Sequence, residues 1–129
     1  MPRFMVLIKS NEKGEAGVMP NQQLQEEMSR YNDELVKAGI RLAAEGLQPS
    51  SKGARVTFDN GTTKVVDGPF AEAKEAVAGY WILQCKSLDE CIEWVKRVPV
   101  EALPGATSGE EIDILRFFDE EDLRELGIA

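Results

Sequence analysis

The stretch RVTFDNGTTKVVDGPFAEAKEAVAGYW, residues 55–81, contains the strongest local structural signals of the chain. In its first half, residues 55–66, Asn60 and Gly61 stand between two runs that are rich in β-branched residues. A two-residue turn of type I′ needs positive φ at both central residues, and Asn and Gly adopt this conformation most easily. Residues 55–66 therefore predict a β-hairpin.

The second half begins with a turn that is crowded with charged residues, residues 67–75. Asp67, Gly68 and Pro69 are typical of a turn, because the Asp side chain accepts local backbone hydrogen bonds, Gly permits positive φ and Pro fixes the chain direction at the exit. An apolar run follows and predicts another strand, residues 79–85.

Outward from this stretch, further segments have the pattern of strands and helices. Together with the run already described, the apolar runs of strand length are residues 4–8, 40–47, 79–85 and 112–118. A first helix is predicted by the spacing of Leu24, Met28, Tyr31 and Leu35, with Gly39 where a helix C-cap belongs. A second helix is predicted to begin after Ser87, which forms a capping-box pattern with Glu90.

The predicted order is strand, helix, strand, hairpin, strand, helix, strand. This order predicts an α+β fold, a ferredoxin-like βαββαβ sheet with two helices on one face and an inserted β-hairpin. The strands are apolar on both faces, so the second face would expose a large hydrophobic patch. A homodimer in which two sheets pack face to face, the dimeric α+β barrel, would bury this patch. We expect one domain, residues 1–118, and an acidic C-terminal tail, residues 119–129.

The composition narrows the classes of function. The chain has 129 residues, of which 43% are hydrophobic and 29% are charged, as in ordinary globular domains. Its net charge of −8 disfavours binding to a phosphate backbone. No apolar stretch approaches the roughly 20 residues of a membrane helix, so we expect a cytoplasmic protein with neither nucleic acid nor membrane as a partner. Cys85 and Cys91 are expected to be buried, reduced thiols.

Histidine is absent from the sequence, which removes several kinds of catalytic site. A Ser-His-Asp triad, a Cys-His pair and an imidazole-ligated zinc site cannot form within the chain. Asp67, Glu72 and Glu75 offer oxygen ligands without any recognised metal-loop spacing, and no glycine pattern suits a nucleotide phosphate. We therefore expect no metal and no cofactor.

Charged and aromatic residues of the turn 67–75 are the candidates for a functional site. The candidate ligand-binding residues are Asp67, Phe70, Glu72, Lys74 and Glu75, and the candidate catalytic residues are Asp67, Glu72 and Lys74. Desolvation in an apolar cleft would raise the pKa of Asp67 or Glu72 towards that of a general base, whereas Lys74 beside it would lower that pKa. The alternative is that these charges form ion pairs that only stabilise the fold or the dimer. The sequence does not decide between the two.

Arginines on expected strands are a second possible source of ligand contacts. Arg3, Arg55 and Arg116 occupy such positions and could bind an anionic ligand. Ion pairing at the surface is the other interpretation of these side chains.

Several segments together resemble the DGPF-type branch of the YCII-related family. They are GLQP at 46–49, the hairpin, DGPFAEAKE at 67–75, GYWIL at 79–83 and SLDECIEWV at 87–95. The resemblance extends over residues 4–118 and implies a dimeric α+β barrel. Better-known members have an enzymatic site built on a His and an Asp, and this site cannot be carried over to a chain without histidine.

The expected function is therefore a small-molecule-binding cleft near residues 67–75 in each subunit of a homodimer, with or without catalysis. Family members often lie beside extracytoplasmic-function sigma factors, and this implies an alternative. The alternative is a non-enzymatic regulatory or interaction module that uses the acidic tail and the exposed helix faces. Its link to sigma factors rests on this association alone.

Overall fold

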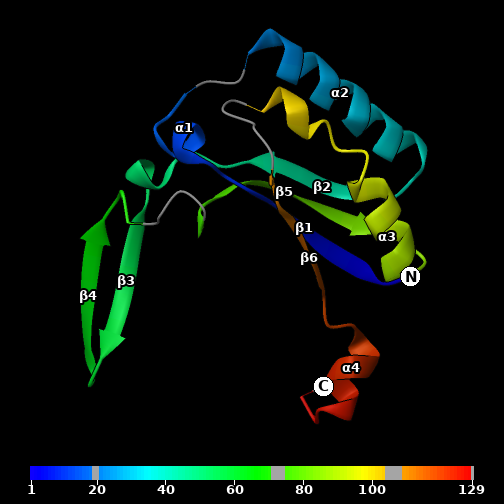
Figure 1. The fold of residues 1–129 in the computed structure, drawn as a ribbon. Coiled ribbons are helices and arrows are strands. Elements are labelled where there is room, and N and C mark those ends of the chain that lie inside the picture. Colours follow the sequence, from blue (N-terminus) through cyan, green and yellow to red (C-terminus); the bar gives the residue numbers. More distant parts are fainter. Residues whose placement is uncertain (19–20, 71–74, 104–108, 129) are drawn as a thin grey trace.

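The computed structural model describes residues 1–18, 21–70, 75–103 and 109–128 (Figure 1). Four antiparallel strands form the main sheet in the order β2-β5-β1-β6. Their bounds are β1 (Arg3–Lys9), β2 (Arg41–Gly46), β5 (Val77–Gln84) and β6 (Ile112–Arg116). Two helices, α2 (Gln22–Lys37) and α3 (Leu88–Val95), connect β1 to β2 and β5 to β6 along the chain. The fold is α+β, and this strand order is consistent with the predicted ferredoxin-like arrangement.

The predicted hairpin forms a separate two-stranded sheet of β3 (Ala54–Asp59) and β4 (Thr62–Asp67). Asn60 and Gly61 have φ angles of 47° and 81°, as the type I′ turn requires. In Figure 1 the hairpin stands away from the main sheet, and every residue from 51 to 65 is exposed. The local signal was therefore sufficient to predict this element.

Side-chain caps fix the starts of the two long helices. The side chain of Asn21 accepts a hydrogen bond from the backbone N–H of Leu24 at 2.8 Å and begins α2. Ser87 accepts from the N–H of Glu90 at 3.1 Å and begins α3. The predicted capping box is only half formed, because the Glu90 carboxylate accepts from the N–H of Lys86 at 3.3 Å.

Short helical segments complete the fold. The segment after β1 contains α1 (Glu12–Glu15), because the Asn11 side chain accepts from the N–H of Gly14 at 2.8 Å and nucleates one turn. The 3₁₀ turns η1 (Ser50–Lys52) and η3 (Val100–Ala102) follow β2 and α3. The tail contains the short helix α4 (Glu120–Glu125), which lies below the end of β6 in Figure 1.

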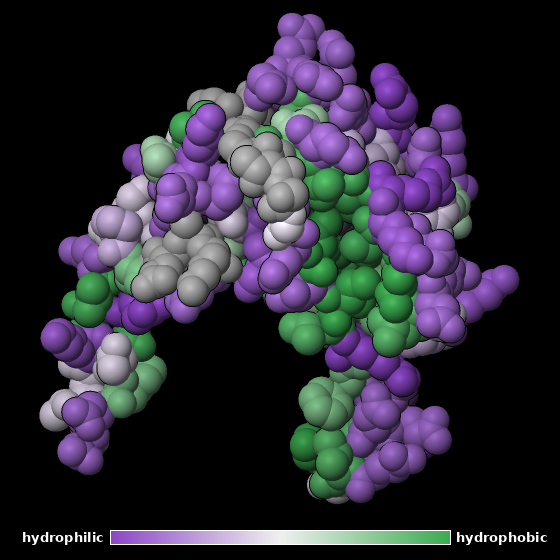
Figure 2. Space-filling model, in the orientation of Figure 1, coloured by the Kyte–Doolittle hydropathy of each residue, from purple (hydrophilic) through white to green (hydrophobic). Residues whose placement is uncertain are grey.

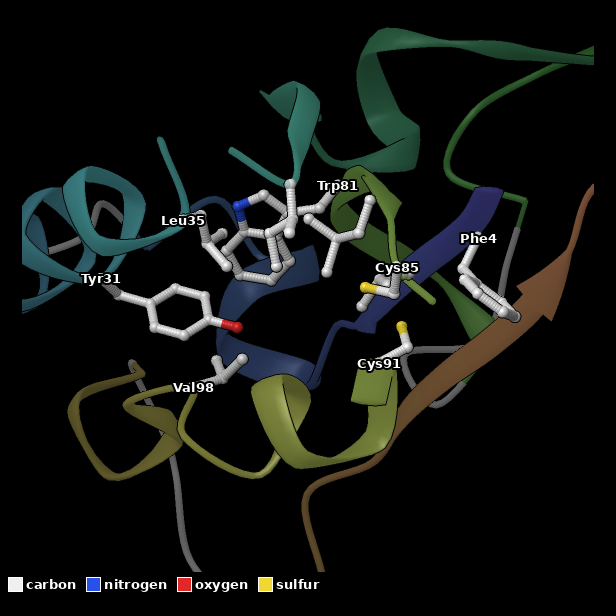
Figure 3. Close-up of a cluster of buried hydrophobic side chains, with 10 residues drawn as sticks. Phe4, Tyr31, Leu35, Trp81, Cys85, Cys91 and Val98 are labelled. Atoms are coloured by element: carbon white, nitrogen blue, oxygen red, sulfur yellow. The ribbon is translucent and has the colours of Figure 1, made fainter. Parts of the chain in front are cut away.

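The core lies between the main sheet and the helices α2 and α3 (Figure 3). Phe4 of β1 and Leu83 of β5 are paired in register, are no more than 1% exposed and point towards the helices. Tyr31 of α2 meets Trp81 edge to face, with ring centroids 5.4 Å apart. The Tyr31 hydroxyl donates to the backbone oxygen of Trp94 at 2.8 Å, so burial leaves this polar group satisfied.

The two cysteines lie next to one another in this core, free and fully buried, as expected (Figure 3). Burial is the main reason why the pKa of Cys85 is raised to about 12, and it also raises the pKa of Cys91. Both thiols are therefore protonated at neutral pH and lack the thiolate that a nucleophile needs.

The opposite face of the main sheet is apolar and only half covered. Met5 pairs with Ile82 and Leu7 with Tyr80, and all four alternate with the core residues of their strands, so they point away from α2 and α3. These side chains are half-buried, and Leu115, opposite Met5 on β6, is 57% exposed. We call this surface the open sheet face. Figure 2 shows a hollow between the hairpin and α4. The hydrophobic residues that this view shows beside α3 belong to the helix-covered side of the sheet, where Ile112 and Ile114 of β6 pack against the core.

None of the helices in the described part of the chain combines the length and apolar character needed to cross a membrane.

Candidate functional site

A cavity of about 490 Å³ lies at the base of the hairpin, beside the turn that the sequence singled out. We call it the hairpin-base cavity. Apolar side chains supply much of its lining: Leu47, Pro49, Phe70, Ala76 and Val77. Its charged lining residues are Glu15, Lys52, Arg55 and Glu75. Segments from four parts of the chain therefore meet around one opening.

A link between α1 and η1 forms one side of the cavity. Both carboxylate oxygens of Glu15 lie 3.2 Å from the backbone nitrogen of Ser50, which donates to them. The Ser50 hydroxyl also donates to the Glu15 carboxylate. These contacts satisfy the Glu15 side chain within the protein and hold η1 in place.

Gly68 closes the base of the hairpin against the same backbone. Its N–H donates to the carbonyl oxygen of Gly53 at 3.0 Å. A Cβ atom on Gly68 would lie 1.7 Å from the Ser50 carbonyl oxygen. The prediction that this glycine supplies positive φ was wrong, because Gly68 is not among the positive-φ residues; the need for glycine comes from the close approach of Ser50.

Arg55 lies over the ring of Phe70 at the hairpin-base cavity. The guanidinium carbon of Arg55 lies 4.7 Å from the centroid of the Phe70 ring, within the range of a cation–π contact. Arg55 belongs to β3, and Phe70 follows the turn after β4. The contact therefore joins strand β3 of the hairpin to Phe70, which lies within the charged turn 67–75.

A family model described as the YCII-related domain matches residues 2–117. The chain belongs to the YCII-related family. This membership confirms the resemblance carried by the turn, the hairpin and the flanking strands. A protein of Rhizobium meliloti (strain 1021), whose name says only that it is uncharacterised, is 32% identical over 76 residues. The match covers 59% of this chain and 61% of that relative, so it spans less than two thirds of the relative's length.

In this YCII-related protein, the five residues that were predicted to bind a ligand lie in different places relative to the cavity. Phe70 and Glu75 line the hairpin-base cavity. Asp67 is exposed at the end of β4 and is not part of the lining. Glu72 and Lys74 lie outside the described residues. Ligand binding by all five stays a prediction, as does catalysis by Asp67, Glu72 or Lys74.

Sequence reasoning missed two of the charged residues at this cavity. Glu15 and Lys52 carry no motif, and only the folding of α1 and η1 towards the hairpin brings them there. Arg55, which lies on a predicted strand, is one of the arginines that the sequence offers to an anionic ligand. Of the other strand arginines, Arg116 forms an ion pair with Asp119 at 3.2 Å, and Arg3 stacks on Phe117.

Glu75 also faces a second cavity, of about 370 Å³, which Lys9 and Asp113 line as well. Lys9 and Asp113 are already paired there, with 3.6 Å between Nζ and the carboxylate oxygen. Within the described ranges, no group of three acidic or cysteine side chains is arranged to hold a metal ion.

The chemistry available to the YCII-related protein at the hairpin-base cavity is therefore mainly that of binding. The described lining offers an apolar surface, two cations and two carboxylates. In the described lining, the Ser50 hydroxyl donates to the Glu15 carboxylate, which also accepts from the Ser50 backbone N–H, so this pair links η1 to α1. The buried thiols lie in the core, away from the cavity.

Proposed function

We propose that this YCII-related protein binds a small organic molecule in the hairpin-base cavity. The observation that carries the proposal is the combination of apolar walls with a few fixed polar groups in a space of about 490 Å³. Small-molecule sites have this character, with volumes of roughly 300–1,000 Å³. The proposal is one of binding, because the hydroxyl–carboxylate contact of the described lining, Ser50 with Glu15, joins η1 to α1 through the Ser50 backbone as well.

Thermal unfolding against a library of metabolites tests the proposal. A compound present at one hundred times its dissociation constant should stabilise the protein by about 2.7 kcal/mol, which raises the melting temperature by several degrees. Phe70→Ala removes a lining ring and should abolish the shift. Phe118→Ala removes a ring that is 62% exposed and not part of this lining, and should retain it. A library without any stabilising compound, or a shift that survives in Phe70→Ala, contradicts the proposal.

We also propose that the protein is a homodimer joined through the open sheet face, as in a dimeric α+β barrel. Support comes from Met5, Leu7 and Leu115, which give this face an apolar surface that a second sheet would bury. The symmetric pairing of two such faces covers the same patch on both subunits.

A charge placed on the open sheet face should break this dimer. Leu115→Lys replaces a side chain that is 57% exposed in the single chain, so the subunit itself should tolerate it. In a face-to-face dimer the lysine would be buried without a partner, and we expect dimerisation to weaken by at least about a hundredfold. Sedimentation across a range of concentrations measures the effect.

Leu88→Lys is the matched control, because Leu88 is 50% exposed on α3, on the other side of the sheet. It should leave the dimer intact. A wild-type protein that is monomeric at all concentrations, or equal dissociation of the two variants, contradicts the face-to-face dimer.

The tail favours a second candidate function, a regulatory interaction module. Leu126 and Ile128 at the end of α4 are 59% and 70% exposed, and they form an apolar edge beside acidic residues. Binding of an extracytoplasmic-function sigma factor to the full chain, lost on truncation after Phe118, would support this candidate. Equal binding by both chains would contradict it.

A further inference from the structure

The two cations of the hairpin-base cavity, Lys52 and Arg55, have no carboxylate partner among the described residues. Over all of the described residues, the structure contains four ion pairs, which join Lys9 to Asp113, Lys96 to Glu93, Arg97 to Glu34 and Arg116 to Asp119. Lys52 and Arg55 belong to none of them, although both line the cavity. Their hydrogen-bond donors are therefore available to a ligand.

The carboxylates of the lining are placed differently. Glu15 accepts from both the backbone and the side chain of Ser50, so its oxygens are occupied. Glu75 is exposed, as Lys52 and Arg55 are, and it lines the second cavity as well. With Glu15 engaged, the charged groups that remain for a ligand in the described lining are two cations and one carboxylate, so positive charge is in excess.

The contact of Arg55 with Phe70 restricts the guanidinium that would bind an acidic group. A cation–π contact uses the charge of the guanidinium and none of its five N–H donors. The Phe70 ring, whose centroid lies 4.7 Å from the Arg55 guanidinium carbon, therefore restricts the side chain and leaves its donor fork for a ligand. Such a fork matches the two oxygens of a carboxylate.

We propose that the ligand is a small organic acid, with one carboxylate joined to an apolar body. The carboxylate binds the Arg55 guanidinium with Lys52 nearby, and the apolar body packs on Leu47 and Val77. This inference rests on the proposed binding function and adds the chemical class of the ligand. The net charge of −8 repels anions at long range, so affinity for an acid depends on these local cations.

Three probes with the same aromatic ring test the charge preference: benzoate is anionic, benzamide is neutral and benzamidine is cationic. Titrations followed by the amide NMR signals of Phe70 and Val77 report binding at the cavity itself. We expect benzoate to bind at least about tenfold more tightly than benzamide, because a charged hydrogen bond is stronger than a neutral one. Benzamidine should leave these signals unchanged.

Variants of Arg55 test its role in this preference. Arg55→Gln should weaken benzoate binding about tenfold or more. Arg55→Lys keeps the positive charge and loses the paired N–H donors, so its affinity for benzoate should lie between those of Arg55→Gln and the wild type. Lys64→Gln is the control, because Lys64 is exposed on β4 and outside the cavity lining, and it should bind benzoate as the wild type does. The amide spectrum of each variant shows whether the hairpin is retained.

The outcomes separate the ligand class from the binding function. If benzamide or benzamidine binds at the cavity as tightly as benzoate, or if Arg55→Gln leaves benzoate binding unchanged, the acid preference is wrong and the binding function stands. If no probe of any charge moves the cavity signals and the metabolite library gives no stabilising compound, both proposals are wrong.

Discussion

Replacing Gly68 with alanine is expected to distort the hairpin-base cavity and to destabilise the protein by about 1–3 kcal/mol, the usual cost of forcing an extra group into packed structure. The added Cβ atom would lie 1.7 Å from the carbonyl oxygen of Ser50 and 2.6 Å from its carbonyl carbon. Both are backbone atoms, so no side-chain rotation relieves the clash. Ser50 is also held by Glu15, which resists its displacement.

Gly46→Ala is the matched control for this experiment. Gly46 ends β2, and a Cβ atom there would meet nothing within 4 Å. Urea unfolding should therefore show a change of less than about 0.5 kcal/mol for this variant. Gly68→Ala should also lose the binding of any compound that stabilises the wild type through the cavity. Equal stability of the two variants would show that the approach of Ser50 does not require glycine.

Gly68 also shows which features the sequence could predict. The Asn60-Gly61 turn and the helix caps at Asn21 and Ser87 depend only on neighbours within a few residues. The turn and the Ser87 cap are predicted from the sequence. The requirement for glycine at position 68 depends on Ser50, which is distant in sequence. Local reasoning identified the right residue and attached the wrong cause to it.

The candidate site was predictable to a similar extent. The turn 67–75 drew attention to Phe70 and Glu75, because dense charge beside apolar strands is uncommon. Glu15 and Lys52 reach the same cavity from α1 and η1. Neither of these short elements was predicted, since a single helical turn has almost no periodicity to detect.

Phe4→Ala is expected to destabilise the protein by about 3–5 kcal/mol, which lowers the melting temperature by roughly ten degrees or more. Phe4 is 1% exposed in the core on the helix-covered face of β1. Removing its ring leaves a cavity and forfeits the transfer free energy of the buried atoms. Its strand lies between β5 and β6, so the surrounding backbone has little freedom to collapse into the space.

Phe58→Ala makes the same chemical change on the hairpin and serves as the comparison. Phe58 is 77% exposed on β3, and a two-stranded hairpin that stands apart from the main sheet contributes little to the packing of the core. We expect a change within about 0.5 kcal/mol for the isolated subunit. A loss as large as that of Phe4→Ala at high protein concentration, absent on dilution, would mean that the hairpin packs against a second copy. A large loss at every concentration would contradict the assignment of the hairpin as an exposed element.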